Sequence, residues 1–288
     1  MKKMMKIAAM LLVFVTTTNA VAQEMPQPSP AAKVEQRIGL TDVTVEYSRP
    51  SVKGRKIFGE LVPNDVTWRT GANKNTLITF TDDVKIGGQS LAAGTYSVFT
   101  IPSEKNPEWT VMFNSVTDGW GEGKYDKAND VVTVSAEPKT IAKQESMLFS
   151  FDNLTDKTGD LVLAWDVVAI SIKIEVEVEK KAWENIKTAM AEATDENKAS
   201  IYRNAAKYAV ATEMQLKEGL GWINESIKAK EYWYSYWVKA DVQHAMGDNK
   251  GAITSAENAI KLGEAGAKES GKLFVYKEKL EKAIADFK

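Results

Sequence analysis

The stretch Ile170-Ser171-Ile172-Lys173-Ile174-Glu175-Val176-Glu177-Val178 lies where the chain changes its repeat of apolar residues. Within this stretch apolar and polar side chains alternate strictly, which is typical of a β-strand with one buried and one wet face. After Glu179 the apolar period becomes helical, and Trp183, Ile186 and Met190 follow at that spacing. The sequence therefore predicts a β-rich half before this point and an α-helical half after it.

Upstream of this point, short β-rich runs are separated by turn residues, and no long helical pattern intervenes. We expect roughly nine strands at the spacing of an antiparallel sandwich or barrel. The runs cover residues 41–47, 76–80, 84–86, 96–101, 109–114, 131–134, 147–151, 161–165 and 170–178. The sequence therefore predicts an antiparallel, β-sandwich-like domain over residues 34–178.

Downstream of this point, glycines and polar turns separate the helical runs. Asp248 directly follows the expected helix terminator Gly247 and is predicted to be the N-cap of the next helix. Thr194-Asp195 is predicted to cap an earlier helix in the same way. We expect roughly five or six helices in antiparallel pairs over residues 180–288, which makes an array of α-hairpins.

One large residue and four alanines are spaced around Gly247-Asp248 in a recognisable order: Tyr236, Ala240, Ala252, Ala256 and Ala259. Three residues, Gly219, Ile223 and Ser226, repeat part of this order 33 residues earlier. The arrangement resembles the tetratricopeptide repeat, with its large residue, small contacts and inter-helix turn. It departs from that repeat at Gln243, where an aromatic residue is usual, and at Glu264, where proline is common. The resemblance implies a short, degenerate tetratricopeptide-like array.

The first residues have the composition of a secretory signal peptide. Lys2, Lys3 and Lys6 precede an apolar run over residues 7–15, and Ala20-Val21-Ala22 forms a small-residue cleavage site before Gln23. The apolar run is too short for a membrane span, which needs about 20 residues. We therefore expect a cleavable signal peptide (1–22), a proline-rich tether (23–33) and a soluble mature protein that is periplasmic or extracellular.

The composition excludes several chemistries. The chain has no cysteine, which excludes disulfides, thiol nucleophiles and thiolate metal sites. Because His244 is the single histidine and no Walker or Rossmann glycine motif is present, we expect no metal and no cofactor. Removal of the three N-terminal lysines changes the formal net charge from −2 to −5, so we expect no nucleic-acid partner.

Long strings in the β half resemble one bacterial secreted family. The strings are Tyr47-Ser48-Arg49-Pro50, Lys53-Gly54-Arg55-x-Ile57-Phe58-Gly59-x-Leu61-Val62-Pro63, Trp68-Arg69-Thr70-Gly71-Ala72-Asn73, Ala93-Gly94-Thr95-Tyr96 and the late Trp165. The family is known as domain of unknown function 2911, and the resemblance runs from about Pro26 to Val178. A helical tail behind such a domain also resembles members of that family. The resemblance implies no activity and no catalytic residue.

Cations and glycines concentrate in these strings around one tryptophan. The candidate anion site is formed by Arg49, Lys53, Arg55, Trp68, Arg69 and Asn73. Arginine presents a rigid fork of donors to carboxylate or phosphate, and the glycines let a ligand approach backbone amides. The alternative is that the arginines pair with Glu60, Asp65 or Asp82. If the chain is extended at Trp68 and Arg69, their side chains should point to opposite faces.

Two further groups of aromatic residues are candidates for binding. Trp120 and Tyr125, in a glycine-rich loop, are suited to stacking on a sugar ring, although such a tryptophan also often plugs one end of a sandwich. The segment 232–237 is rich in tyrosine and tryptophan, which fits either the core between helices or an aromatic surface for a protein partner.

The sequence supports two classes of function. The favoured class is an exported, non-catalytic binding or assembly module of the cell envelope, with an anionic small molecule or glycan as ligand and a protein partner at the helical half. The alternative is a carboxylate-dependent hydrolase acting on glycan, because turns contain paired acids such as Asp82-Asp83. Two close carboxylates with raised pKa values in one cleft would favour the enzyme.

Overall fold

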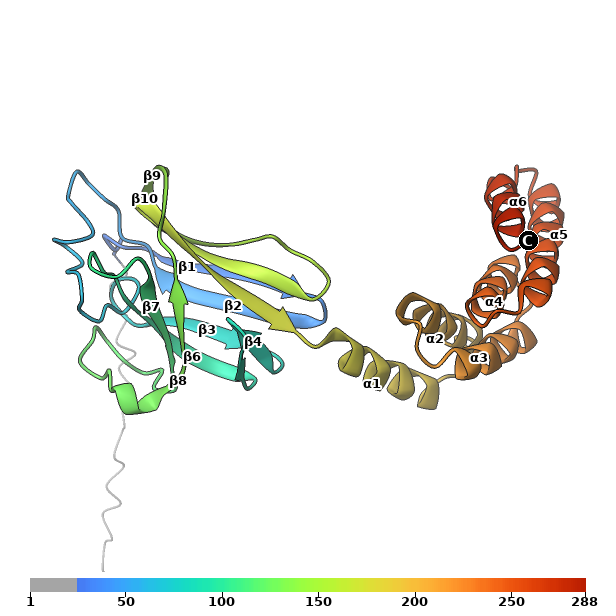
Figure 1. Cartoon of the computed structure of the whole chain (residues 1–288), viewed down its shortest axis with the longest axis horizontal. Coiled ribbons are helices and arrows are strands. Elements are labelled where there is room, and N and C mark those ends of the chain that lie inside the picture. The colour runs from blue at the N-terminus through green and yellow to red at the C-terminus, as the bar shows by residue number, and fades with distance from the viewer. Residues whose placement is uncertain (1–24) are drawn as a thin grey trace, which may run out of the picture. The chain divides into compact units, whose positions relative to one another are not determined.

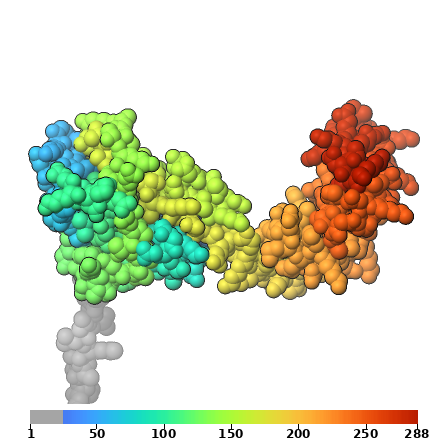
Figure 2. Space-filling view, in the orientation of Figure 1, coloured from blue at the N-terminus to red at the C-terminus, as the bar shows by residue number. Residues whose placement is uncertain are grey.

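The structure is a computed structural model that describes residues 25–288, and the predicted signal peptide over residues 1–22 lies outside the described residues. The chain forms two compact units, drawn as ribbons in Figure 1 and as surfaces in Figure 2. The first unit comprises residues 25–36, 42–154 and 159–174, and the second comprises Arg37–Thr41, Thr155–Thr158 and Glu175–Lys288. The predicted order of a β-rich half followed by an α-helical half is confirmed.

The β-rich unit contains two antiparallel sheets. The larger sheet has the order β1 (Ala31–Ile38), β2 (Thr41–Ser48), β3 (Thr76–Phe80), β6 (Gly94–Ile101), β7 (Trp109–Asn114), β8 (Asp130–Ala136). The smaller sheet has the order β5 (Gln89–Leu91), β4 (Val84–Ile86), β10 (Thr158–Val176), β9 (Lys139–Asp152). A short 3-10 helix, Lys127–Asn129, precedes β8.

The observed strands depart from the expected ones at β1, β5 and β10, and β9 (Lys139–Asp152) is longer than the expected run 147–151. Strand β1 begins inside the predicted tether. Its residues alternate between exposed and half-buried, as in an edge strand that faces water, so the strand lacks the run of buried apolar residues that a sequence pattern detects. Strand β5 has only three residues, too few to show a period. The expected strands 161–165 and 170–178 are one strand, β10, whose pairing with β9 is irregular on both sides of Asp166, where φ is +52°.

Alternation of side chains builds the core of the β-rich unit. In β2 every second residue is buried, including Val43, Val45 and Tyr47. In β6 and β7 consecutive residues are buried, so both faces of these central strands are covered. The segment around Trp68 continues this sheet beside β6. The backbone of Trp68 pairs with that of Thr100, two residues beyond the pair of Thr76 with Val98 that ends the pairing of β3 with β6.

The second unit contains six helices in the described residues, as the sequence predicted. They are α1 (Val178–Ala191), α2 (Lys198–Thr212), α3 (Leu216–Ala229), α4 (Trp233–Ala245), α5 (Asn249–Glu269) and α6 (Lys277–Asp286). Helix α2 packs on α3, and α4 packs on α5, so these helices form antiparallel pairs. No helix within residues 25–288 combines the length and the apolar character needed to cross a bilayer.

The predicted N-caps of two helices have different outcomes. Asp248 caps α5, because its side chain accepts a hydrogen bond from the backbone N–H of Gly251 at 2.9 Å. The prediction for Thr194-Asp195 was wrong, since α2 begins after Asn197. The side chain of Asn197 accepts instead from the backbone N–H of Thr194, which closes a turn before the helix.

Candidate functional site

A cavity of about 520 Å³ lies beside Trp68 and Arg69 in the β-rich unit. Its volume falls in the range of about 300–1,000 Å³ that is usual for small-molecule sites. Its walls come from the segments around residues 50–72, from Glu122 in a later loop and from Trp165 in β10. Segments far apart in the sequence therefore meet here, supported by the sheets beneath them.

Aromatic rings form the base of the cavity. Trp68 and Trp165 are stacked, with ring centroids 5.9 Å apart and planes at 21°. The ring of Phe58 meets both edge-on, each at 6.2 Å. The indole N–H of Trp68 donates to the carbonyl oxygen of Gly71 at 3.2 Å. The indole Nε1 of Trp165 is buried and has no hydrogen-bond partner among the described residues.

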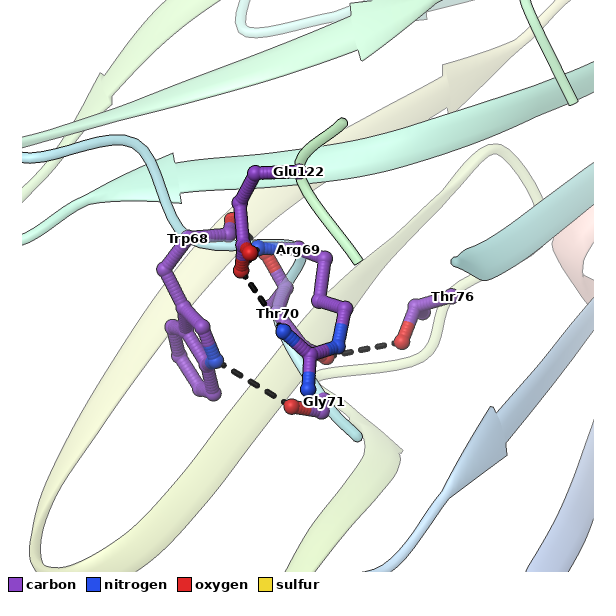
Figure 3. Close-up of polar contacts among 6 residues, drawn as sticks. All are labelled: Trp68, Arg69, Thr70, Gly71, Thr76 and Glu122. Atoms are coloured by element: carbon purple, nitrogen blue, oxygen red, sulfur yellow. Dashed lines mark hydrogen bonds and ion pairs between the residues drawn. The ribbon is translucent and has the colours of Figure 1, made fainter. Parts of the chain in front are cut away.

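An ion pair forms the polar wall (Figure 3). The Nη1 of Arg69 donates to Oε1 of Glu122 at 2.8 Å, and the backbone N–H of Arg69 donates to the same oxygen at 3.3 Å. The two side chains are 25% and 42% exposed, so the pair lies at the mouth of the cavity rather than in the core. The Nε of Arg69 is buried and has no partner within residues 25–288.

The turn after Arg69 is fixed by hydrogen bonds among buried threonines. Thr70 adopts φ +54°, its carbonyl oxygen accepts from Oγ1 of Thr76 at 2.7 Å, and its hydroxyl pairs with that of Thr100 at 2.8 Å. A Cβ at Gly71 would lie 2.8 Å from Oγ1 of Thr76, so glycine is required for this close approach. Trp68 pairs with Thr100 as an isolated bridge rather than within a continuous strand, and Trp68 and Arg69 both line the cavity.

The structure brings together only part of the candidate anion site. Arg55, Trp68 and Arg69 line the cavity. The guanidinium of Arg55 donates to the carbonyl oxygens of Ser51 at 2.5 Å and Val52 at 3.1 Å, so part of its capacity is used by its own turn.

The other candidates are not among the lining residues and serve the scaffold. The Nε of Arg49 donates to the carbonyl oxygen of Met147 at 2.8 Å. The backbone N–H of Lys53 donates to Oε1 of Glu145 at 2.8 Å. The amide of Asn73 donates to the carbonyl oxygen of Ser29 and to the hydroxyl of Ser48, both at 3.3 Å.

Glu122 lines the cavity and pairs with Arg69, and the sequence did not predict it as a site residue. The acids proposed as partners of the arginines are engaged elsewhere: Glu60 with Lys56, Asp65 with Ser103 and Asp82 with Thr81. The sequence signal nearest to Glu122 was the glycine-rich loop that contains it. The amide of Gly121, at φ +70°, donates to the carbonyl oxygen of Asn73 at 3.1 Å and brings the loop alongside this segment.

The candidate sugar-stacking residues are in different environments. Trp120 is 67% exposed, which leaves its ring accessible to solvent. Tyr125 packs against Phe99 with centroids 4.7 Å apart, and its hydroxyl donates to Oδ2 of Asp130 at 2.9 Å. Burial and this hydrogen bond raise the pKa of Tyr125 to about 12. Of these two candidates, Trp120 is the one that presents an accessible aromatic ring.

A comparison with family models gives one match to this unit. The model described as "Protein of unknown function (DUF2911)" matches residues 29–174, more than half of the chain. The chain belongs to this family. The DUF2911 match includes the whole cavity, from Ser29 to Trp165. Neither a curated protein nor a solved structure matches the chain.

The chemical character of the DUF2911 cavity follows from its lining. Glu122 is the one carboxylate among the described residues that line it, beside the cations Arg55 and Arg69. In the part of the chain that the structure describes, no cluster of three or more His, Asp or Glu side chains is arranged to hold a metal ion. The cavity thus combines aromatic rings, hydrogen-bond donors and a formal charge of one positive unit.

Proposed function

We propose that the protein is an exported, non-catalytic binding module of the cell envelope whose DUF2911 domain holds an anionic small molecule or anionic sugar. The supporting observation is that the wall formed by Arg69 meets the stacked pair of Trp68 and Trp165 in one cavity. Aromatic rings bury the apolar body of a cyclic ligand, and a guanidinium offers donors to its anion.

The alternative, a glycan hydrolase, receives less support from this cavity. Glycosidases of the common type need two carboxyl groups about 5–10 Å apart across the scissile bond. Among the described residues that line the cavity, Glu122 is the one acid, and its carboxylate is paired with Arg69. Glu122 therefore has no second carboxyl group among the described lining residues with which to share the roles of acid and nucleophile.

For the helical half we propose a degenerate tetratricopeptide-like scaffold that contacts a protein partner. Ala240, Ala252, Ala256 and Ala259 are fully buried, as small inter-helix contacts would be. A second cavity of about 480 Å³ is lined by aromatic and apolar side chains, among them Leu273, which is 89% exposed. Exposed apolar side chains around a groove are typical of protein contact surfaces.

The ligand proposal is tested by thermal unfolding of the mature chain with galacturonate, sulfate or galactose. We expect an anion to raise the melting temperature of the wild type and of Lys56→Gln, an exposed cation of the same segment that does not line the cavity. Arg69→Gln should bind at least about tenfold more weakly, because a charge-assisted hydrogen bond contributes about 1.5–3 kcal/mol. If no anion or sugar stabilises the wild type, the cavity is not a site for this class of ligand.

Export is tested separately by the intact mass of the protein recovered from the extracytoplasmic fraction. The segments before Gln23 predict a chain that starts at Gln23 and carries no lipid. A recovered chain that retains Met1 would contradict the signal-peptide proposal.

A further inference from the structure

Two buried nitrogen donors in the β-rich unit lack an acceptor among residues 25–288: Nε of Arg69 and Nε1 of Trp165. Both residues line the same cavity. Buried donors in folded proteins are almost always paired, so an unpaired donor needs an explanation. The fold thus leaves two polar atoms of cavity-lining residues unsatisfied.

The carboxylate of Glu122 shows which kind of group Arg69 accepts. Its Oε1 receives hydrogen bonds from both Nη1 and the backbone N–H of Arg69. Glu122 is 42% exposed, so its carboxylate can turn into water without burying its charge. Its loop is held on both sides of Glu122, by the hydrogen bond of Gly121 to Asn73 and by that of Tyr125 to Asp130, so a side-chain rotation is sufficient.

We infer that Glu122 is an internal placeholder for the carboxylate of a ligand, and that an entering carboxylate displaces it from Arg69. This inference rests on the proposed function of the cavity. It makes the ligand a cyclic carboxylate such as a uronic acid. Glu122 then sets the affinity and charge preference of the site without contacting the ligand.

The geometry of the pair explains why exchange is favourable. Glu122 engages Nη1 of Arg69 and leaves Nε unpaired, so the internal pair does not satisfy the guanidinium. A carboxylate that arrives from the cavity is not tied to the loop and can take two donors of the fork, which is the stronger arrangement.

Charge favours a carboxylate over inorganic phosphate. Arg55, Arg69 and Glu122 give the lining one net positive charge, which a single carboxylate neutralises. A phosphate dianion would leave an excess negative charge beside the displaced Glu122, and like charges at close range repel. The cavity therefore prefers a monovalent anion with an apolar body.

The inference is tested by calorimetric titration of the mature chain with galacturonate, galactose and inorganic phosphate. Glu122→Gln removes the competing charge and should bind galacturonate about three- to fivefold more tightly than the wild type, the size expected for a partly exposed ion pair. Arg69→Gln should lose galacturonate binding. Asp118→Asn is the matched control, because it removes an exposed negative charge from the same loop whose partner is Lys124 rather than Arg69.

Each outcome has a distinct meaning once thermal melts show that the variants are folded. Tighter galacturonate binding by Glu122→Gln alone supports the placeholder. If Asp118→Asn binds galacturonate more tightly by the same factor, the effect is one of general charge and the placeholder proposal is overturned. If Glu122→Gln binds galacturonate more weakly than the wild type, Glu122 holds the ligand directly and the proposal is also overturned. Phosphate binding as tight as that of galacturonate overturns the carboxylate preference. If neither wild type nor Glu122→Gln binds any of the three, the proposed function itself fails.

Discussion

Asp241 of α4 is a carboxyl group in a largely buried position, and burial raises its pKa to about 6. A hydrogen bond from the side chain of Trp237 and the charges of His244 and Lys279 oppose this shift but do not cancel it. The folded protein therefore favours the protonated acid more than the unfolded chain does. The contribution of Asp241 to the stability of the folded state is complete below about pH 4 and is lost as pH rises through about pH 6.

Asp241→Asn should therefore stabilise the helical unit at pH 7.5 by about 2 kcal/mol and have little effect at pH 4. Asparagine keeps an acceptor for Trp237 and removes the cost of a buried charge. Urea unfolding followed by circular dichroism at both pH values measures the difference. Glu257→Gln, which neutralises an exposed acid on α5, should change stability little at either pH. A gain that is equal at pH 4 and pH 7.5 would contradict this account.

The pair of Arg69 and Glu122 makes a second residue-scale prediction. Because both partners are partly exposed, Arg69→Ala should cost about 1 kcal/mol or less, and a double-mutant cycle with Glu122→Ala should give a coupling of about 0.2–1 kcal/mol. Chemical unfolding of the two single variants and the double variant measures it. A cost of about 3–5 kcal/mol would show that an acid is left buried and uncompensated.

Residue types predicted the centre of this site but not its partner. The strings around Trp68 and Arg69 indicated a cation beside an aromatic ring, and both line the cavity. Glu122 comes from a loop more than fifty positions later in the chain, and nothing local in the sequence fixes which acid reaches Arg69. Arg49, Lys53 and Asn73 looked equivalent to Arg69, yet the side chains of Arg49 and Asn73 make scaffold hydrogen bonds and Lys53 contributes its backbone N–H.

Whole elements were predictable where one face is buried. Strand β2 and the second half of β10 alternate in burial as their side chains alternate in polarity. Strand β1 was missed because its exposed edge shows only a weak alternation, and the continuity of β10 was missed because Asp166 interrupts the period without ending the strand.

The cap of α5 makes a prediction at the scale of the element. Asp248→Ala removes the acceptor for the backbone N–H of Gly251 and should cost about 1 kcal/mol. Asp195→Ala is the matched control, because Asp195 is exposed and α2 begins later, at Lys198. Thermal melts of the two variants provide the comparison. An equal loss from both substitutions would show that the effect is one of surface charge rather than of capping.

At the scale of the whole molecule, the boundary between the two compact units does not coincide with the point, after Glu179, where the apolar repeat changes from strand-like to helical. The second unit includes Arg37–Thr41 and Thr155–Thr158 together with the helices. Within it, Lys157 pairs with Glu179, and the Nζ of Lys181 donates to the carbonyl oxygen of Leu40 at 3.0 Å. Helix α1 also packs on α2 and α3 through Trp183, whose ring lies 5.0 Å from Tyr208 and 5.9 Å from Trp222.

We therefore expect residues 25–174 and 175–288 each to fold when expressed alone, with the isolated helical fragment less stable than the same helices in the full chain. Loss of the contacts made by Leu40 and Lys157 is the physical reason. Circular dichroism should show a β spectrum for the first fragment and a helical spectrum for the second. If neither fragment shows its spectrum, the two units depend on a single shared core.

Because Trp68 and Trp165 come from segments far apart in the chain, their stacking determines when the cavity can form during synthesis and folding. During synthesis Trp68 is available early, but Trp165 arrives only with β10, after the other strands. Pairing between such distant segments is slow compared with the formation of local contacts. A nascent chain therefore has no cavity before β10 is present. The cavity is complete only after β10, the last strand in the chain, has joined its sheet.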